Sequence, residues 1–419
     1  MIQRPDYLAK LEKFKDKELI KIITGIRRCG KSTLLYLFRE QLSAAGTAPE
    51  QMIVMNLEDP ENRNFLSWEA LYDHVAARLL PDRINYVFLD EVQLVPDFQR
   101  AAIGLFNKKN VDLYITGSNA FLLSGELATL LAGRYIEISM LPLSFKEFLS
   151  AFESPAIEKP KIERSVMTSP QQDLSRRYQD YITNSSFPYT LKLRGSTAQV
   201  SEEIQAYLGG IYNTIVLKDI MERRKFADPL MLESVIRFMF DNIGNLSSTQ
   251  KISNTLNSAG RKISVNTVEN YLSALTASFI LYRLGRFDIK GKQLLKTGDK
   301  YYLADPALRL YLLGREAADY GRVLENIVFL ELLRRGKRLA IGKLGDQEID
   351  FVAESPRQTG YYQVALSVRD DATLERELRP LLAIRDHHPK WILTLDDDPS
   401  ASYQGIQRLN VLDWLLTDE

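Results

Sequence analysis

The residues best suited to chemistry lie in a glycine-rich segment near the start of the chain. Residues 25–32 read GIRRCGKS and match the phosphate-binding pattern G-x-x-x-x-G-K-[ST]. Gly25 and Gly30 permit the backbone angles with which such a loop turns its amide groups toward a phosphate. We expect Lys31 to reach the β- and γ-phosphates of ATP and Ser32 to bind Mg²⁺.

The sequence around this loop supplies the context that the pattern requires. An apolar run at 19–24 predicts a buried strand before the loop, and apolar side chains at helical spacing predict a helix at 31–45. The other predicted ATP-binding residues, within and just after the loop, are Arg27, Arg28, Cys29 and Thr33. Cys29 occupies a variable position of the pattern, where we interpret it as a small filling side chain.

A second apolar run, YVFLDE at 86–91, ends in two carboxylates. The carboxyl ends of strands in parallel sheets face the ligand, so we expect Asp90 to hold Mg²⁺ and Glu91 to activate the attacking water. A carboxylate pair, rather than a single aspartate, favours a hydrolase over a kinase. The alternative interpretation is an acidic helix N-terminus that stabilises the helix dipole.

Polar groups also follow the apolar run at 111–116. Thr116 is the favoured contact to the γ-phosphate or the attacking water, with Ser118 and Asn119 as alternatives. A turn capped by these side chains is the other interpretation. Asn56, which follows a further apolar run, is a candidate partner of Glu91.

Arg134 is the residue that we expect to act between subunits. It precedes the apolar run at 135–140, and an arginine at this place can project into a neighbour's nucleotide site and neutralise transition-state charge. This interpretation predicts a homo-oligomer, with a ring as one arrangement. The alternative is a solvated surface arginine.

Strands and helices alternate over the first 150 residues. Helical patterns, for example at 67–80 and 97–108, separate apolar runs at 52–57, 85–90, 111–116 and 135–140. The alternation predicts an α/β fold with a parallel sheet. Beyond it, the sequence predicts a loop at 152–175, mainly helices from 176 to about 285, and a second strand-rich region at 339–419.

These segments resemble the AAA+ core of a prokaryotic ATPase family that joins this core to a C-terminal domain of unknown role. The core segments are GIRRCGKS, YVFLDE, LYITGSNA and LAGRYIEISMLPLSFKEF. The resemblance covers nearly the whole chain, since it continues through YLGGIYNTIVLKDIMER, YYLADPALRLYLLG, ENIVFLELLRRG and EIDFVAE. It implies ATP hydrolysis in a cytoplasmic protein.

The segment 231–303 predicts a winged helix, with three helices before a β-hairpin at 281–303 and a recognition helix that starts at 264–268. Residues 251–300 hold nine Lys/Arg against three Asp/Glu, a net +6, whereas 341–419 hold eight against fifteen, a net −7. The basic segment predicts contact with the DNA backbone. Candidate contacts are Arg261, Lys262, Lys290 and Lys292. Alternatively, the winged helix packs on the ATPase as a lid or a protein contact.

Residues 325–366 resemble the restriction-endonuclease-like fold. Its active form places an aspartate before an acid-x-lysine on the next strand, and these groups hold a metal and assist the attacking water. Here Glu325 lies on a predicted helix and Asp350 takes the aspartate position. Gln363 and Ala365 stand at the positions of the acid and the lysine. This departure predicts a nuclease-like fold without nuclease activity.

Composition limits the class of protein. The chain has 419 residues, 45% hydrophobic and 26% charged, with a formal net charge of zero, which predicts two or three soluble domains. We predict an AAA+ core at 1–150, a linker and helical lid at 151–230, a winged helix at 231–315 and a nuclease-like domain at 316–419. The single cysteine, the charged N-terminus and the lack of a membrane-length apolar run predict a cytoplasmic protein with no membrane partner.

Three functions remain open at this point. The leading hypothesis is an AAA+ ATPase that uses ATP and Mg²⁺ to bind or remodel DNA or a DNA-associated partner. The alternative is an ATP-dependent signalling switch that gates protein contacts without DNA. A nuclease driven by ATP is disfavoured by Gln363 and Ala365.

Overall fold

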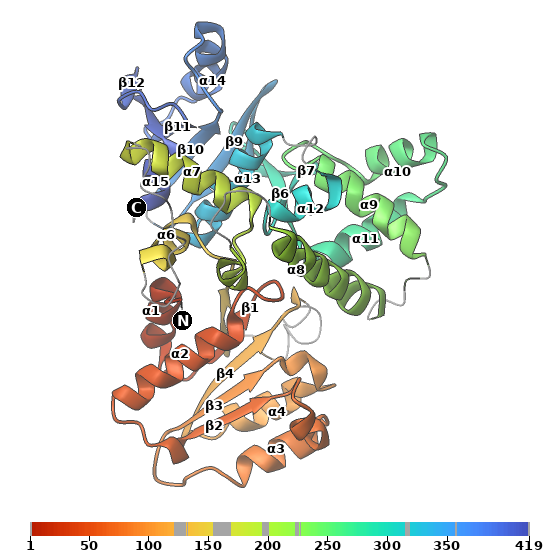
Figure 1. Ribbon diagram of the computed structural model, residues 1–419, viewed down its shortest axis with the longest axis vertical. Helices are drawn as coiled ribbons and strands as arrows, with labels where there is room; N and C mark the ends of the chain where they lie inside the picture. Colours follow the sequence, from red (N-terminus) through yellow and green to blue (C-terminus); the bar gives the residue numbers. More distant parts are fainter. Residues whose placement is uncertain are drawn as a thin grey trace. The chain divides into compact units, whose positions relative to one another are not determined.

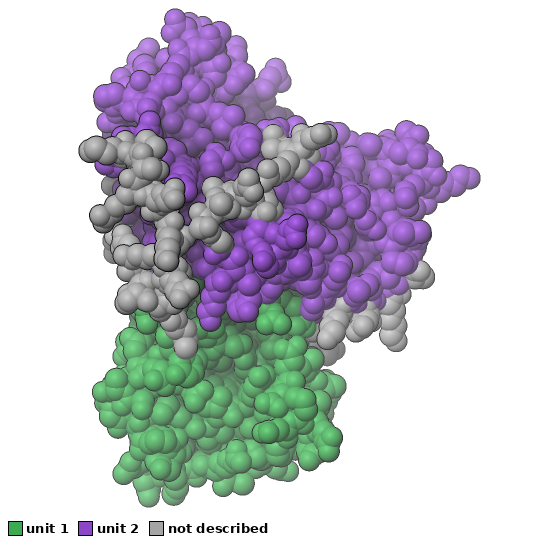
Figure 2. Space-filling model, viewed as in Figure 1, with its two compact units in different colours: residues 1–142, 277–279 green, residues 143–276, 280–419 purple. Residues whose placement is uncertain are grey.

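The computed structural model describes residues 2–120, 131, 133–153, 169–194, 201–222, 226, 228–314, 319–356 and 358–417. They form two compact units, residues 1–142 with 277–279 and residues 143–276 with 280–419, which Figure 2 colours separately. The first unit carries the glycine-rich loop, and the second carries the basic and acidic segments.

A five-stranded parallel sheet forms the centre of the first unit, in the order β2-β3-β4-β1-β5 (Figure 1). Its strands are β1 (Ile20–Thr24), β2 (Met52–Asn56), β3 (Asn85–Asp90), β4 (Val111–Gly117) and β5 (Tyr135–Ser139). All five lie within or close to the predicted apolar runs. The prediction of a parallel α/β fold is therefore confirmed.

Alternating side chains along β4 explain how helices cover both faces of this sheet. Leu113 and Ile115 belong to the buried cluster that also contains side chains of α3 (Trp68–Ala76) and α4 (Phe98–Phe106). Tyr114 lies between them in sequence, and its ring centroid is 5.2 Å from that of Phe38 on α2 (Lys31–Ala44). Since successive strand side chains point to opposite faces, α2 covers the face opposite to α3 and α4. The short helix α1 (Pro5–Phe14) packs against α2.

The second unit begins with helices. In chain order they are α6 (Phe145–Glu153), α7 (Pro170–Thr183), α8 (Glu202–Asn213), the π-helix Thr214–Glu222, α9 (Pro229–Asp241), α10 (Thr249–Ser258) and α11 (Val265–Ala277). Helix α7 starts inside the predicted loop at 152–175. The reason is a capping box, in which Ser169 Oγ accepts the Gln172 N–H and Gln172 Oε1 accepts the Ser169 N–H. Residues 154–168 of that predicted loop lie outside the described part of the chain.

An eight-stranded mixed sheet completes this unit, in the order β12-β13-β11-β10-β9-β8-β6-β7. Its strands are β6 (Leu281–Asp288), β7 (Gln293–Leu303), β8 (Arg338–Leu344), β9 (Gln347–Glu354), β10 (Thr359–Val364), β11 (Lys390–Thr394), β12 (Ala401–Tyr403) and β13 (Ile406–Asn410). The hairpin that follows α11 thus pairs with the C-terminal strands, because β6 runs parallel to β8. The remaining helices are α12 (Ala307–Leu313), α13 (Tyr320–Arg334), α14 (Asp371–Ala383) and α15 (Val411–Leu416).

Helix α13 packs on this sheet through an aromatic cluster. The ring of Phe329 stacks on Tyr302 of β7, with 4.3 Å between the centroids, and lies 6.3 Å from the ring of Phe351 of β9. The helix therefore joins the hairpin to the C-terminal strands. Among the described residues, none of the helices has the length and apolar character of a membrane span.

Candidate nucleotide site

The glycine-rich loop connects β1 to α2, as the sequence predicts. Gly25 has a φ of 148°, and a Cβ atom built on it would lie 2.1 Å from the Met140 carbonyl oxygen. Gly30 has a φ of 106° and immediately precedes α2. A side chain is therefore excluded at Gly25 by contact and strained at Gly30 by backbone angle.

Lys31 folds back over this loop. Its Nζ donates hydrogen bonds to the carbonyl oxygens of Gly25 at 3.0 Å and Ile26 at 3.2 Å. The same nitrogen lies 3.8 Å from Glu91 Oε1, and both side chains are buried. A cation is thus held beside the N-terminus of α2, where backbone N–H groups favour an anion.

Asp90 is the last residue of β3 and hydrogen bonds to hydroxyl groups of two other elements, β4 and α2. The hydroxyl of Thr116 on β4 donates to Asp90 Oδ1, and Ser32 hydrogen bonds to the same carboxylate. Burial raises the pKa of Asp90 above its usual value, although these two hydroxyls oppose that rise. A carboxylate beside the loop serine is the oxygen donor set that Mg²⁺ takes next to phosphates, so the residues present fit a Mg²⁺ ion.

Glu91 lies in the left-handed backbone region, with a φ of 55°. Its N–H donates to Thr116 Oγ1 at 3.0 Å, and its Oε2 accepts hydrogen bonds from Gln93 Nε2 and from Ser118 Oγ at 3.2 Å. Burial acts to raise the pKa of Glu91, but Lys31 and these donors outweigh it and hold the pKa below its usual value. The carboxylate is therefore ionised at neutral pH.

The other predicted loop residues take up different positions. Arg27 Nη1 lies 3.3 Å from Glu58 Oε1, Arg28 has a φ of 66°, and Thr33 is exposed. Cys29 is completely buried, which raises the pKa of its thiol and fits a filling role. Its carbonyl oxygen accepts a hydrogen bond from the buried guanidinium of Arg4 at 3.2 Å.

The candidate sensor residues separate into two groups. Thr116 links Asp90 to the backbone of Glu91, whereas Ser118 contacts the Glu91 carboxylate itself. Asn119 is buried. Asn56, the candidate partner of Glu91, is exposed, and its Oδ1 accepts the Glu58 N–H at 3.1 Å. The hydrogen bonds described for the Glu91 carboxylate come from Gln93 and Ser118.

Arg134 lies at the edge of the sheet and has an exposed side chain. Its carbonyl oxygen accepts the Ile20 N–H at 2.8 Å, just before β5 pairs with β1. The backbone of Arg134 is thus held by the sheet while its guanidinium faces outward. A contact with a neighbouring subunit stays a prediction.

Sequence reasoning missed Arg4 and Gln93. Arg4 precedes α1 and connects the loop to the segment after β5, because its Nη1 donates to the Cys29 carbonyl and its Nη2 donates to the Leu141 carbonyl at 2.9 Å. Gln93 lies two positions after Glu91, which is the only sequence signal for its role. A contact across a tight turn cannot be recognised from spacing alone.

A second polar cluster lies in the other unit. Lys300 Nζ of β7 lies 2.9 Å from Glu325 Oε1 of α13, 3.0 Å from Glu348 Oε1 and 3.3 Å from Asp350 Oδ1 of β9. Burial raises the pKa of Glu325 to about 7, against the opposing effect of Lys300. The single ammonium group of Lys300 lies among all three carboxylates and offsets part of their negative charge.

The lysine of this cluster does not come from the position that the nuclease-like pattern indicates. Gln363 stands at the acid position, where its Oε1 accepts the Asp350 N–H at 2.8 Å and its Nε2 donates to Glu377 at 2.8 Å. Lys300 enters from β7, far earlier in the chain than Ala365. Lys300 is one of the nine Lys/Arg counted in the basic segment 251–300, but it is buried and does not contribute to a basic surface.

The predicted DNA contacts are all exposed, namely Arg261, Lys262, Lys290 and Lys292. They form two pairs. Arg261 and Lys262 precede α11, whereas Lys290 and Lys292 lie in the β6–β7 turn. The backbone at the start of this turn is held by the Ile289 N–H, which donates to the Lys343 carbonyl oxygen at 2.9 Å. Helix α11 contains neither lysine nor arginine, so the charge lies beside the predicted recognition helix.

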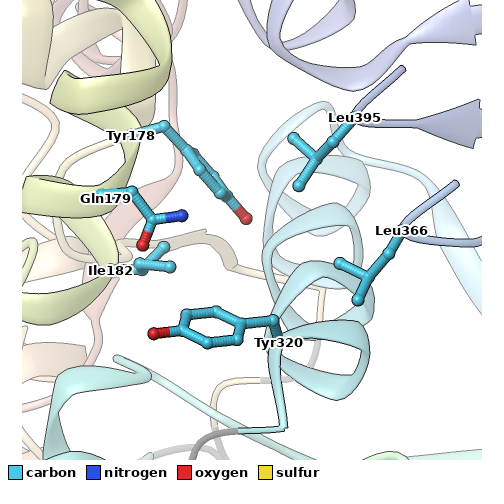
Figure 3. Close-up of a pocket in the computed structure, with 6 residues that line it drawn as sticks. All are labelled: Tyr178, Gln179, Ile182, Tyr320, Leu366 and Leu395. Carbon is cyan, nitrogen blue, oxygen red and sulfur yellow. The ribbon is translucent and has the colours of Figure 1, made fainter.

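A pocket of about 370 Å³ also lies in the second unit (Figure 3). Its described lining comprises Tyr178, Gln179, Ile182, Tyr320, Leu366 and Leu395. The lining is mainly apolar and contains none of the predicted site residues.

Comparisons with known proteins identify a domain over the segment that carries the glycine-rich loop. Residues 17–149 match the family described as AAA domain, and residues 175–319 match a domain of unknown function, DUF8612. An uncharacterized protein of Haemophilus influenzae is 38% identical over 418 residues, 99% of this chain and 99% of that protein. This chain belongs to the same family. An uncharacterized protein of Methanocaldococcus jannaschii is 28% identical over 337 residues, 80% of this chain and 71% of that protein.

Two solved structures align with part of this chain at low sequence identity. The Walker-type ATPase paby2304 of Pyrococcus abyssi aligns with a TM-score of 0.49 and 15% identity, covering 74% of this chain and 96% of that one. The Aeropyrum pernix Orc1 protein, solved in complex with DNA, aligns with a TM-score of 0.35 and 14% identity, covering 74% and 92%. The AAA domain match confirms the AAA part of the predicted resemblance, over residues 17–149. The winged-helix and nuclease-like assignments stay predictions.

Proposed function

We propose that this protein hydrolyses ATP with the help of Mg²⁺. The observation that carries the proposal is the convergence of Lys31, Asp90 and Glu91, which come from the loop and from the end of β3. Lys31 would bind the phosphates, and Ser32 with Asp90 would hold Mg²⁺, which neutralises phosphate charge. Glu91 would accept a proton from the attacking water.

The test of this proposal is phosphate release from ATP by the purified full-length chain. Wild-type protein should release phosphate, and Lys31→Ala should neither bind nor hydrolyse ATP, because the loop loses its cation. The control is Lys13→Ala, which removes an exposed lysine of α1. Equal turnover by wild type and Lys31→Ala would refute the assignment of this site.

The purpose of hydrolysis is proposed as binding or remodelling of DNA or a DNA-associated partner. The support is the exposed basic pairs beside α11 and in the β6–β7 turn. The alternative is a switch that gates protein contacts without DNA. Turnover measured with and without duplex and single-stranded DNA, at two salt concentrations, separates them, since only the DNA-coupled enzyme should be stimulated in a salt-dependent manner.

A nuclease is not part of this proposal. A metal ion would have to compete with the ammonium group of Lys300 for Glu325, Glu348 and Asp350. Lys300 already occupies the space between these carboxylates and offsets part of their charge.

A further inference from the structure

We infer that Gln93 is a positioning residue, which holds the Glu91 carboxylate in the orientation required to activate the attacking water. This inference rests on the proposed ATP hydrolysis. Gln93 belongs to the short helix η3 (Val92–Leu94), which follows Glu91 directly. Its Nε2 donates to Glu91 Oε2 and lies 3.2 Å from Ser118 Oγ.

The two oxygens of the Glu91 carboxylate have different surroundings, because only one of them accepts hydrogen bonds from Gln93 and Ser118. Gln93 and Ser118 both donate to Oε2 of Glu91, whereas Oε1 faces Lys31 Nζ at 3.8 Å. Because Lys31 is the residue expected to reach the phosphates, Oε1 is the oxygen directed toward the substrate. Two donors on Oε2 prevent the carboxylate from rotating away from that direction.

The amide oxygen of Gln93 indicates that the contact with Glu91 determines how the Gln93 side chain is oriented. Among the described residues Gln93 Oε1 is buried and has no hydrogen-bond partner, an arrangement that reduces stability. Exchanging the positions of the amide nitrogen and oxygen of Gln93 would not give a better arrangement, because it would place Oε1 against the Glu91 carboxylate. The side chain therefore donates to Glu91 at the expense of its own acceptor, as residues at functional sites often do.

A second glutamine of the same unit provides a matched comparison. Gln99 also lies two positions after an acid with a φ of 55°, Asp97, and its Nε2 donates to Asp97 Oδ1 at 3.4 Å. That hydrogen bond lies at the surface. The two glutamines share local geometry and differ in the role of the acid that they contact.

The experiment compares Gln93→Met and Gln99→Met with wild type in the full-length chain. Methionine keeps the length and volume of glutamine but donates no hydrogen bond. We expect Gln93→Met to lower kcat about 10- to 100-fold, the range for small misplacements of a catalytic group, with KM for ATP unchanged.

The melting temperature distinguishes a positioning role of Gln93 from a structural role, because loss of a structural contact would lower it. The melting temperature of nucleotide-free Gln93→Met should equal or exceed that of wild type, because the unpaired acceptor is removed. Gln99→Met should change neither kcat nor KM for ATP. An unchanged kcat in Gln93→Met, or a lower kcat accompanied by a higher KM for ATP and a lower melting temperature, would overturn the inference alone. Wild-type protein that binds ATP without turnover would overturn the proposed function together with it.

Discussion

Lys31 Nζ and Glu91 Oε1 lie 3.8 Å apart within the first unit. This contact lowers the pKa of Glu91 while burial acts to raise it. If Lys31 turns to the phosphates of ATP, as proposed, Glu91 would lose part of that stabilisation and its pKa should rise. The carboxylate would therefore become a stronger base only when the substrate is present.

Glu91→Gln should bind ATP and hydrolyse it very slowly. Loss of a general base reduces turnover by about 10²–10⁴-fold, while Lys31 and Ser32 remain in place to bind nucleotide. Calorimetric titration with ATP and phosphate release measure the two properties separately. Glu40→Gln, an exposed change on α2, serves as the control, and unchanged turnover in Glu91→Gln would leave Glu91 as a helix cap.

Arg134→Ala should reduce turnover but leave ATP binding almost intact. The guanidinium is exposed at the sheet edge, and an arginine supplied by a neighbouring subunit can contribute about 10³–10⁵-fold to turnover. Specific activity of wild type should rise with protein concentration. Arg78→Ala, an exposed arginine of the same unit, should behave as wild type.

Mixing two inactive variants tests the direction of this contact. Arg134→Ala and Lys31→Ala each supply what the other lacks, so a mixed oligomer should regain activity. If mixed assembly is confirmed and the mixture stays inactive, Arg134 does not act between subunits.

Lys300→Met should destabilise the protein in a pH-dependent manner. Removing one partner of a buried ion pair typically lowers the free energy of unfolding by about 3–5 kcal/mol. The pKa of Glu325 is raised in the folded protein, so the stability linked to its protonation is present at low pH and is lost as the pH rises through about 7. Without Lys300 that pKa should rise further, so the variant should continue to lose stability above about pH 7. The difference in stability from wild type should therefore grow over the range of about pH 6 to 9.

Urea unfolding of Lys300→Met and wild type across this pH range measures the effect. Lys290→Met, an exposed change at the hairpin turn, provides the control. A difference in stability that does not vary with pH would show that Lys300 acts through packing.

Charge reversal at the two basic pairs should weaken DNA binding. Arg261→Glu with Lys262→Glu, and Lys290→Glu with Lys292→Glu, each remove cations that would bind phosphates. The salt slope of the binding constant should fall by about 1 for every phosphate that the variant no longer binds. Fluorescence anisotropy with labelled duplex DNA measures both the affinity and this slope. The control reverses Lys13 and Lys17 on the other unit, and wild-type affinity in both test pairs would favour the switch without DNA.

Most of the fold could be predicted from local patterns. The strands of the first unit are buried apolar runs, and the glycine-rich loop between β1 and α2 has a fixed spacing. Partners that meet through tertiary structure were not predictable. Lys300 approaches Glu325 and Asp350 only because β6 pairs with β8 and α13 packs across the sheet. Gln93 reaches Glu91 only because the backbone of Glu91 adopts a positive φ, which no sequence pattern indicates.

The pairing of β6 with β8 has a consequence for any shortened form of this chain. Residues 286–288 of β6 lie in register with residues 341–343 of β8. A fragment that stops after the hairpin would leave this side of β6 with unpaired backbone groups, and an exposed strand edge recruits strands from other chains. Such fragments should self-associate or precipitate, so isolating the basic region for study requires retention of β8 and its neighbours.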